Sequence, residues 1–79
     1  MEIEVRLYSE MRRYSPGHTP GYSDRLSIRL GATVAEAIDT LGIPVDLPAV
    51  IFVNGGSAER NTVLKAEDVL VVMSPIQGG

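Results

Sequence analysis

The sequence predicts an α+β domain in which a mixed sheet of four to five strands carries one helix across one face. Two observations predict the strands. Residues 2–8 and 25–30 alternate between apolar and polar side chains, whereas residues 49–53 and 69–73 are apolar throughout. A third observation predicts the helix, because apolar residues recur at spacings of three and four between residues 33 and 42.

The N-terminal part is expected to form a hairpin with a long connection. Period-two alternation is typical of a strand with one buried face. Residues 9–14 are expected to make a helical turn capped by Ser9, and residues 15–21 are dense in turn-forming residues. The residues expected to face the core are Ile3, Val5 and Leu7 in the first strand and Leu26, Ile28 and Leu30 in the second.

The helix has recognisable start and stop signals. Thr33 and Glu36 form a predicted capping box, in which the hydroxyl accepts from a first-turn amide and the carboxylate reaches back to the cap amide. Gly42 supplies a left-handed stop, and Pro44 lies just beyond it. A helix of eight to ten residues is stable only against a sheet. Its apolar stripe consists of Val34, Ala37, Ile38 and Leu41.

The C-terminal half predicts two further strands buried on both faces, at residues 49–53 and 69–73. Residues 54–56, Asn-Gly-Gly, signal a tight turn, with Asn54 as a turn residue. A short edge strand is expected at residues 57–61, and a polar turn at residues 65–68.

A helix between two hairpin-like pairs must cross one face of the sheet to bury its stripe, and this arrangement is a β-grasp. The 79 residues have too little surface to bury two cores. The β-grasp domain is therefore expected to cover residues 1–73, and residues 74–79 are expected to form a flexible tail.

Composition excludes several classes of function. The chain has no cysteine, which excludes disulfides and a catalytic thiol, and it fits a reducing cytoplasm. A net charge of −3 does not favour nucleic-acid binding. The N-terminus does not read as a signal peptide, and no apolar run is long enough for a membrane span. Cytoplasmic localisation is therefore expected.

Side-chain catalysis has no candidate constellation. The single histidine, His18, lies in a Pro/Gly loop without a partner acid or metal ligand, and reads as a surface histidine. Gly55 and Gly56 do not belong to a phosphate-binding motif, and Ser9 and Ser74 have no activating base. No metal site and no bound cofactor are expected.

The C-terminal tail is the better candidate for chemistry. Gly78 and Gly79 end a six-residue segment that can extend at most about 20 Å beyond the last strand. Residues without a Cβ can enter a channel too narrow for any other side chain. Pro75 stiffens the base of the tail. The tail could present its carboxylate inside another protein, or it could be a frayed terminus.

The motifs from residue 53 to the end resemble the MoaD/ThiS family of ubiquitin-like sulfur carriers. They are Val-Asn-Gly at residues 53–55, Val-Leu-Lys-Ala-Glu-Asp-Val at residues 63–69 and Ser-Pro-Ile-Gln-Gly-Gly at residues 74–79. The helix start and the Leu-Gly-Ile-Pro helix end at residues 41–44 are similar to the molybdopterin-synthase small-subunit branch. Glu67, Ser74 and Met73 depart from the usual Gly, Pro and Phe of the motif.

This resemblance implies a carrier rather than an enzyme. A ubiquitin-activating-like enzyme of the MoeB/ThiF type would use ATP to adenylate Gly79, and a sulfur donor would convert it to a thiocarboxylate. The tail would then dock in a molybdopterin synthase large subunit of the MoaE type, to build the dithiolene that holds molybdenum or tungsten. Gly78 would grant access, and Pro75, Ile76 and Gln77 would position the tail.

The resemblance also points to the sheet face away from the helix as the docking surface, with Leu70 or Met73 contributing. Alternation separates these two residues, and the sequence does not say which meets the helix. A covering loop is the other explanation for apolar residues on both sides. Three other functions remain open: a thiazole-pathway carrier, a ubiquitin-like protein modifier, and a β-grasp interaction module without covalent chemistry.

Overall fold

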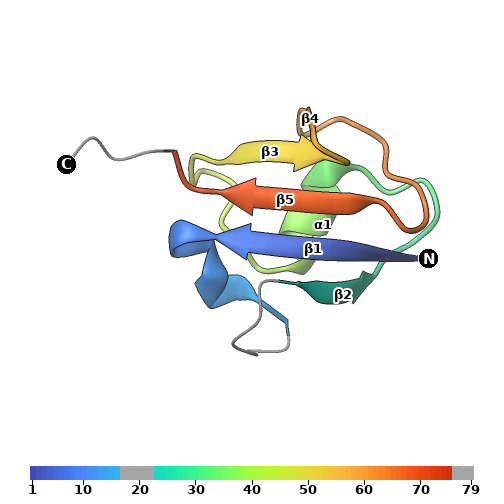
Figure 1. Cartoon of the computed structure of the whole chain (residues 1–79), viewed down its shortest axis with the longest axis horizontal. Coiled ribbons are helices and arrows are strands. Elements are labelled where there is room, and N and C mark those ends of the chain that lie inside the picture. The colour runs from blue at the N-terminus through green and yellow to red at the C-terminus, as the bar shows by residue number, and fades with distance from the viewer. Residues whose placement is uncertain (17–22, 76–79) are drawn as a thin grey trace.

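A five-stranded sheet carries one α-helix across one face (Figure 1). The computed structural model describes residues 1–16 and 23–75 of the chain. The predicted β-grasp architecture is confirmed, with a 3-10 helix in addition to the α-helix. The elements in chain order are β1 (Glu2–Tyr8), η1 (Ser9–Tyr14), β2 (Asp24–Ser27), α1 (Val34–Thr40), β3 (Val50–Val53), β4 (Gly56–Ser57) and β5 (Val69–Met73).

The strand order is β2-β1-β5-β3-β4, so the first and last strands of the chain lie side by side at the centre. β1 and β5 pair in parallel, with Val5 opposite Leu70 and Leu7 opposite Val72. β2 is antiparallel to β1, and β3 is antiparallel to β5. The sheet is therefore mixed, and its central parallel pair joins residues that are more than sixty positions apart in the sequence.

The core lies between the sheet and α1. As the alternation in β1 predicts, its apolar residues are buried and its polar residues face the other side. β5 contributes Leu70 and Val72, which are both 0% exposed. Burying such aliphatic side chains stabilises the fold by about 1.5–3 kcal/mol each before entropy is counted. The other main members are Ile3, Val5, Leu7, Met11, Val34, Ala37, Ile38, Ile43, Ile51 and Leu64.

The N-terminal cap of α1 uses the two predicted capping-box residues, but Glu36 has a stronger partner than the cap. Thr33 accepts a hydrogen bond from the Glu36 amide through its hydroxyl at 3.3 Å, as predicted. Arg29 lowers the pKa of the Glu36 carboxyl group most, and the Thr33 amide at the cap lowers it further, so this carboxylate does face the cap. It accepts two hydrogen bonds from the guanidinium of Arg29, at 2.6 and 2.7 Å. A charge-assisted pair is stronger than a bond from the neutral cap amide, so Arg29 is the main partner of this carboxylate.

The C-terminal end of α1 forms as predicted. Gly42 has φ of +84°, a conformation that glycine adopts without steric cost. Its amide donates to the Asp39 carbonyl at 3.0 Å, and the Ile43 amide donates to the Ile38 carbonyl at 3.2 Å. These two bonds are the Schellman motif, and both isoleucines belong to the core.

The N-terminal expectations need two corrections. Ser9 is the first residue of η1 rather than its cap, since Tyr8 occupies the cap position and no side chain caps this helix. The second strand ends at Ser27, and Leu30 is 76% exposed instead of buried. Strand pairing stops because the chain turns away at Gly31, which has φ of +80°.

The edge beyond β3 also differs from the expectation. β4 comprises only Gly56 and Ser57, so the short edge strand begins one residue earlier than predicted and ends much sooner. The predicted tight turn is confirmed, because Asn54 and Gly55 have φ of +51° and +85°. Two successive positive φ values match the twist of a two-residue hairpin.

The two faces of β5 should respond differently to truncation. Leu70→Ala removes a fully buried side chain, and we expect the free energy of unfolding to fall by about 2–5 kcal/mol. Val71→Ala acts on the half-exposed face and should lower it by about 1 kcal/mol or less. Urea denaturation of both variants measures the difference, and equal losses would contradict the assignment of the two faces.

Candidate functional site

The structure fixes the root of the tail from both sides. Met73, the last residue of β5, pairs with Tyr8 of β1 on one side and with Val50 of β3 on the other. Ser74 and Pro75 follow, and both are partly buried. A terminal segment that leaves a central strand starts from a defined place and direction, unlike one that leaves an edge.

The predicted reacting residue and three of its neighbours lie outside the described part of the chain. They are Ile76, Gln77, Gly78 and Gly79. Their assigned roles therefore stay predictions. Of the tail residues, Ser74 and Pro75 have a described environment.

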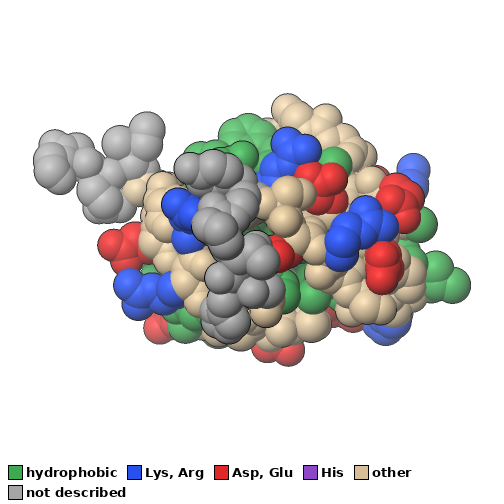
Figure 2. All heavy atoms as spheres, turned by 60° about the horizontal axis from the view of Figure 1, so that its bottom comes forward, with side chains coloured by type: hydrophobic (Ala, Val, Ile, Leu, Met, Phe, Trp, Pro, Cys, Tyr) green, Lys and Arg blue, Asp and Glu red, His purple; other side chains and the backbone are tan. Residues whose placement is uncertain are grey.

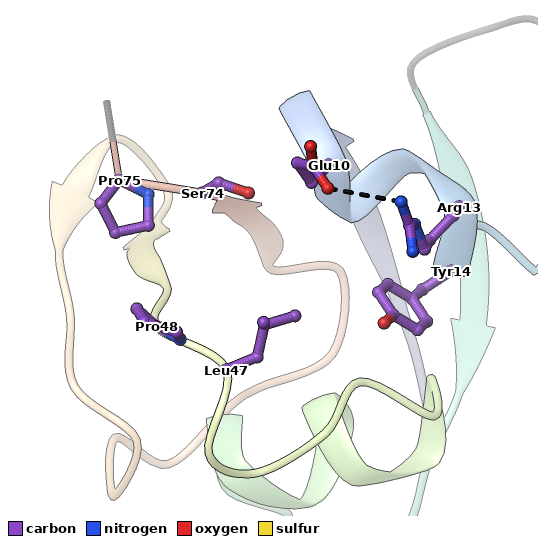
Figure 3. Close-up of a pocket in the computed structure, with 7 residues that line it drawn as sticks. All are labelled: Glu10, Arg13, Tyr14, Leu47, Pro48, Ser74 and Pro75. Carbon is purple, nitrogen blue, oxygen red and sulfur yellow. Dashed lines mark hydrogen bonds and ion pairs between the residues drawn. The ribbon is translucent and has the colours of Figure 1, made fainter. Parts of the chain in front are cut away.

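That environment is a groove of about 390 Å³ beside the root of the tail (Figure 3). Its apolar wall comes from the segment after α1 and from the tail root, while η1 supplies a polar wall. In the polar wall, Arg13 donates to the Glu10 carboxylate at 3.3 Å. The groove is lined by Glu10, Arg13, Tyr14, Leu47, Pro48, Ser74 and Pro75. Sequence reasoning missed this feature, because its residues come from three separate segments.

The sheet face away from α1 carries a second candidate surface, which we name the apolar open face. In Figure 1, α1 lies behind the sheet, so this face is turned toward the viewer. Strand register brings half-exposed apolar side chains of three adjacent strands together on it. Its members are Tyr8, Val50, Phe52, Val69, Val71 and Met73.

This register corrects the prediction for β3 and β5. Neither strand is buried on both faces, since Val50 is 36% exposed and Met73 is half-buried. Met73 lies on the open face, as the expectation for a docking residue requires. Leu70 points the opposite way into the core, so the prediction that it contacts a partner is wrong. Its pairing with Val5 puts it on the helix side.

The β2 side of the same sheet face is charged. Arg25 of β2 donates to Glu2 at 3.2 Å and to Glu67 at 3.0 Å, and these carboxylates raise the pKa of its guanidinium, Glu67 more than Glu2. Glu4 accepts hydrogen bonds from Ser23 and from Arg6, both at 2.6 Å, and these bonds lower the pKa of its carboxyl group. On the side of the molecule shown in Figure 2, acidic and basic side chains alternate over the described residues.

One side-chain cluster ties the β3–β4 turn to the start of β5. The Asn54 amide group donates to Asp68 at 2.9 Å, and its oxygen accepts from the Val69 amide at 2.9 Å. Asp68 also accepts from the Lys65 amide at 2.7 Å through its other oxygen. Asn54 therefore does more than make a turn. The signal in the sequence that could have revealed this contact is an Asn at the end of one predicted strand and an Asp, fourteen residues later, at the start of the next.

Residues 1–16 and 23–75 contain neither a candidate metal site nor a candidate membrane span. This part of the chain has no group of three or more His, Asp or Glu side chains that could hold a metal ion. It also has no helix long and apolar enough to cross a membrane. Ser74 lies in the groove described above, and His18 lies outside the described residues.

The model of the ThiS family matches residues 5–79, nearly the whole chain. The chain belongs to the ThiS family. Like other ThiS/MoaD-type sulfur carriers, it has the ubiquitin-like β-grasp fold. A search of curated proteins returned no match.

Solved structures share the fold of this ThiS-family protein at low sequence identity. SAMP1 from Haloferax volcanii superimposes with a TM-score of 0.76 at 19% identity over 100% of both chains. A second structure, of H. volcanii small archaeal modifier protein 1, gives 0.72 at 21% identity, over 95% of this chain and 98% of that one. A chain from the complex of subunits 1 and 2 of molybdopterin-converting factor from Helicobacter pylori superimposes with a TM-score of 0.63 at 21% identity, over 100% of this chain and 100% of that chain.

The structure explains one departure from the family motif. Glu67, at the position where the motif has Gly, adopts φ of +68°. A left-handed conformation costs a non-glycine residue about 1–2 kcal/mol. Glu67 offsets part of this cost through two hydrogen bonds from Arg25, at 3.0 and 3.1 Å. The turn before β5 therefore keeps the backbone shape for which glycine is usually chosen.

Loss of the Asn54 side chain should lower the free energy of unfolding of this ThiS-family protein. Asn54→Ala removes two hydrogen bonds worth about 1 kcal/mol each and adds strain at positive φ, so we expect a loss of about 2–4 kcal/mol. Asn54→Gly removes the same bonds without the strain and should cost about 1–2 kcal/mol. Thermal unfolding of the pair measures both values. A glycine variant less stable than the alanine variant would refute the role of backbone strain.

Proposed function

We propose that this chain carries sulfur as a thiocarboxylate on Gly79 for the dithiolene of molybdopterin. The observation that supports this most is the position of the tail root. The Gly-Gly end follows the central strand β5, whose last residue is paired on both sides. A fixed root lets a partner bind the domain and receive the carboxylate at a set distance, which lowers the entropic cost of the reaction.

The chemistry requires activation from outside the chain. A carboxylate is a poor acyl group, so an adenylating enzyme would use ATP to form a mixed anhydride at Gly79. A sulfur donor would displace AMP and leave the thiocarboxylate, whose sulfur would attack the pterin precursor. In this proposal the chain binds no cofactor of its own, and the partners supply the acid, base and oxyanion-stabilising groups.

Two surfaces of the domain suit partner binding. The apolar open face offers Val71 and Phe52 near its centre, flanked by the charged side chains of β1 and β2. An apolar centre with a polar rim is the usual anatomy of a protein interface. The groove at the tail root, which Leu47 and Tyr14 line, would bind partner residues that contact the start of the tail. The adenylating enzyme and the synthase large subunit are the proposed partners.

A second function has support from the H. volcanii structures, which are of a small archaeal modifier protein. The same activated Gly79 would then be transferred to an amine of another protein instead of receiving sulfur. The H. pylori complex of two molybdopterin-converting factor subunits supports the first function. The two functions share activation and differ in the acceptor. A thiazole-pathway carrier would differ in the acceptor as well.

Activation should be visible in the intact mass. After incubation with the adenylating enzyme, ATP and sulfide, we expect one C-terminal oxygen to be replaced by sulfur. A chain that lacks Gly79 should keep its mass. Gly79→Ala should keep the fold but lose most of the product, because the added methyl group blocks close approach in a glycine-sized channel. Full conversion of the alanine variant would contradict that channel, and no conversion of the wild type would contradict the carrier function.

The apolar open face can be tested separately with a matched pair of variants. Val71→Glu places a charge at the centre of this face and should weaken binding to the synthase large subunit by at least about tenfold, or 1.4 kcal/mol. Val63→Glu makes the same change at a 58% exposed position whose backbone is bridged to Thr33, away from this face. Isothermal titration with both variants, after thermal melts confirm folding, measures the effect. Equal affinities would exclude this face from the interface.

A further inference from the structure

Lys65 differs from every other basic side chain of the protein. It is the single lysine among seven Lys and Arg residues, all of which lie in the described part of the chain. Each of the six arginines has a hydrogen-bonding or electrostatic partner. The partners are Glu4 for Arg6, Glu10 for Arg13, Glu2 and Glu67 for Arg25, Glu36 for Arg29 and the Leu47 carbonyl for Arg60, and Arg12 also has an interaction partner. The exposed Lys65 ammonium group forms no ion pair or hydrogen bond with the described residues.

Guanidinium groups do not lose their proton near neutral pH, and an imidazole such as that of His18 gives only a hydrolysable acyl product, so the nitrogens of this chain that can form a stable amide are amines. Apart from Lys65, the chain has only the terminal amine of Met1. That amine donates to the Ile28 carbonyl at 2.7 Å, and Met1 is half-buried beside the β1–β2 pair. The Met1 carbonyl accepts from the Ile28 amide in turn, at 2.8 Å. Lys65 is thus the accessible amine of the protein.

The backbone of Lys65 is held firmly although its side chain is free. The Lys65 amide donates to the Asp68 carboxylate at 2.7 Å, and the Asp68 amide donates to the Lys65 carbonyl at 3.1 Å. Asp68 is itself fixed by Asn54. The turn at residues 65–68 therefore presents the amine from a defined position, as a modification site on a rigid element requires.

The turn also lies at the end of β5 opposite the root of the tail (Figure 1). The five residues of β5 separate the two ends by about 17 Å at 3.3 Å per residue. A second copy could bring its tail to Lys65 without covering the tail root of the first. Such a contact joins two different surfaces, so copies would be linked head to tail.

We propose that Lys65 is the acceptor through which one copy of this chain is linked to the Gly79 carboxylate of another. This inference rests on the proposed activation of Gly79. The neutral ε-amine attacks the carbonyl carbon of the Gly79 adenylate and forms a C–N bond. The bond from that carbon to the AMP oxygen breaks, AMP leaves with the electron pair, and the amine gives its extra proton to water. The product is an isopeptide between Lys65 and Gly79.

The experiment incubates the purified chain with the adenylating enzyme and ATP, without sulfide. We expect a species with the mass of two chains less one water. Trypsin should cut the donor after its own unmodified Lys65, which is the last basic residue. It should therefore leave residues 66–79 attached to Lys65 of the acceptor. ATP–pyrophosphate exchange in the same mixture measures adenylation independently.

Two variants make the test specific. Lys65→Arg should lose the conjugate and keep pyrophosphate exchange at the wild-type rate. Combining Lys65→Arg with Arg29→Lys returns one lysine to the chain at a position beside Glu36, and this variant should remain without conjugate.

Conjugation of either variant, or a remnant found on Met1, would overturn the assignment of Lys65. Exchange without any conjugate would overturn this inference alone. Absence of exchange in the wild type would overturn the proposed function, and the inference with it.

Discussion

Parallel pairing of β1 with β5 organises the molecule. The register that joins Val5 to Leu70 and Leu7 to Val72 aligns the apolar sides of the two central strands. Only then does a continuous apolar surface exist for α1 to cover. A helix of seven residues has little stability by itself, so it depends on this surface. Because the paired strands are the first and the last, this pairing brings the two ends of the domain together in the sheet that α1 covers.

The same pairing creates the features that suit a carrier. Since β5 lies between β1 and β3, the tail begins at a residue bonded on both sides. Since β5 is apolar on both sides, one side fills the core and the other contributes to the apolar open face. The work of an activated carboxylate requires binding partners more than it requires catalytic side chains. A small domain with a fixed tail root and one open apolar face meets that requirement.

Local interactions at the far end of β5 keep this strand in place. Asn54 and Asp68 link two turns that precede different parts of the sheet. Glu67 accepts a left-handed conformation with the help of Arg25, which crosses from β2. These contacts involve polar residues at the surface, yet they set the starting point of the strand that leads to the tail. They also position Lys65, the amine at the opposite end from the tail.

The sequence by itself determined the order of strands and helix and the two ends of the helix, because periodicity and capping are encoded within a few adjacent residues, whereas the lengths of β2 and β4 differ from the prediction. Thr33, Gly42 and the Asn54–Gly55 turn could be assigned in this way. The assignment of the terminal glycines as the reactive end comes from motif and family, and it stays a prediction. The residues of β5 alone do not predict which side of this strand packs against the helix, since Leu70 and Met73 are both apolar.

Only the tertiary structure decided the questions that depend on contacts between distant segments. Register between β1 and β5 buried Leu70 and left Met73 on the open face. The groove at the tail root needed η1 and the segment after α1 to meet beside Pro75. The ion pair of Glu36 with Arg29, and the lack of a charged partner for Lys65 among the described residues, likewise depend on which charges fold next to each other. Periodicity constrains one segment at a time, whereas burial and charge pairing are properties of the assembled sheet.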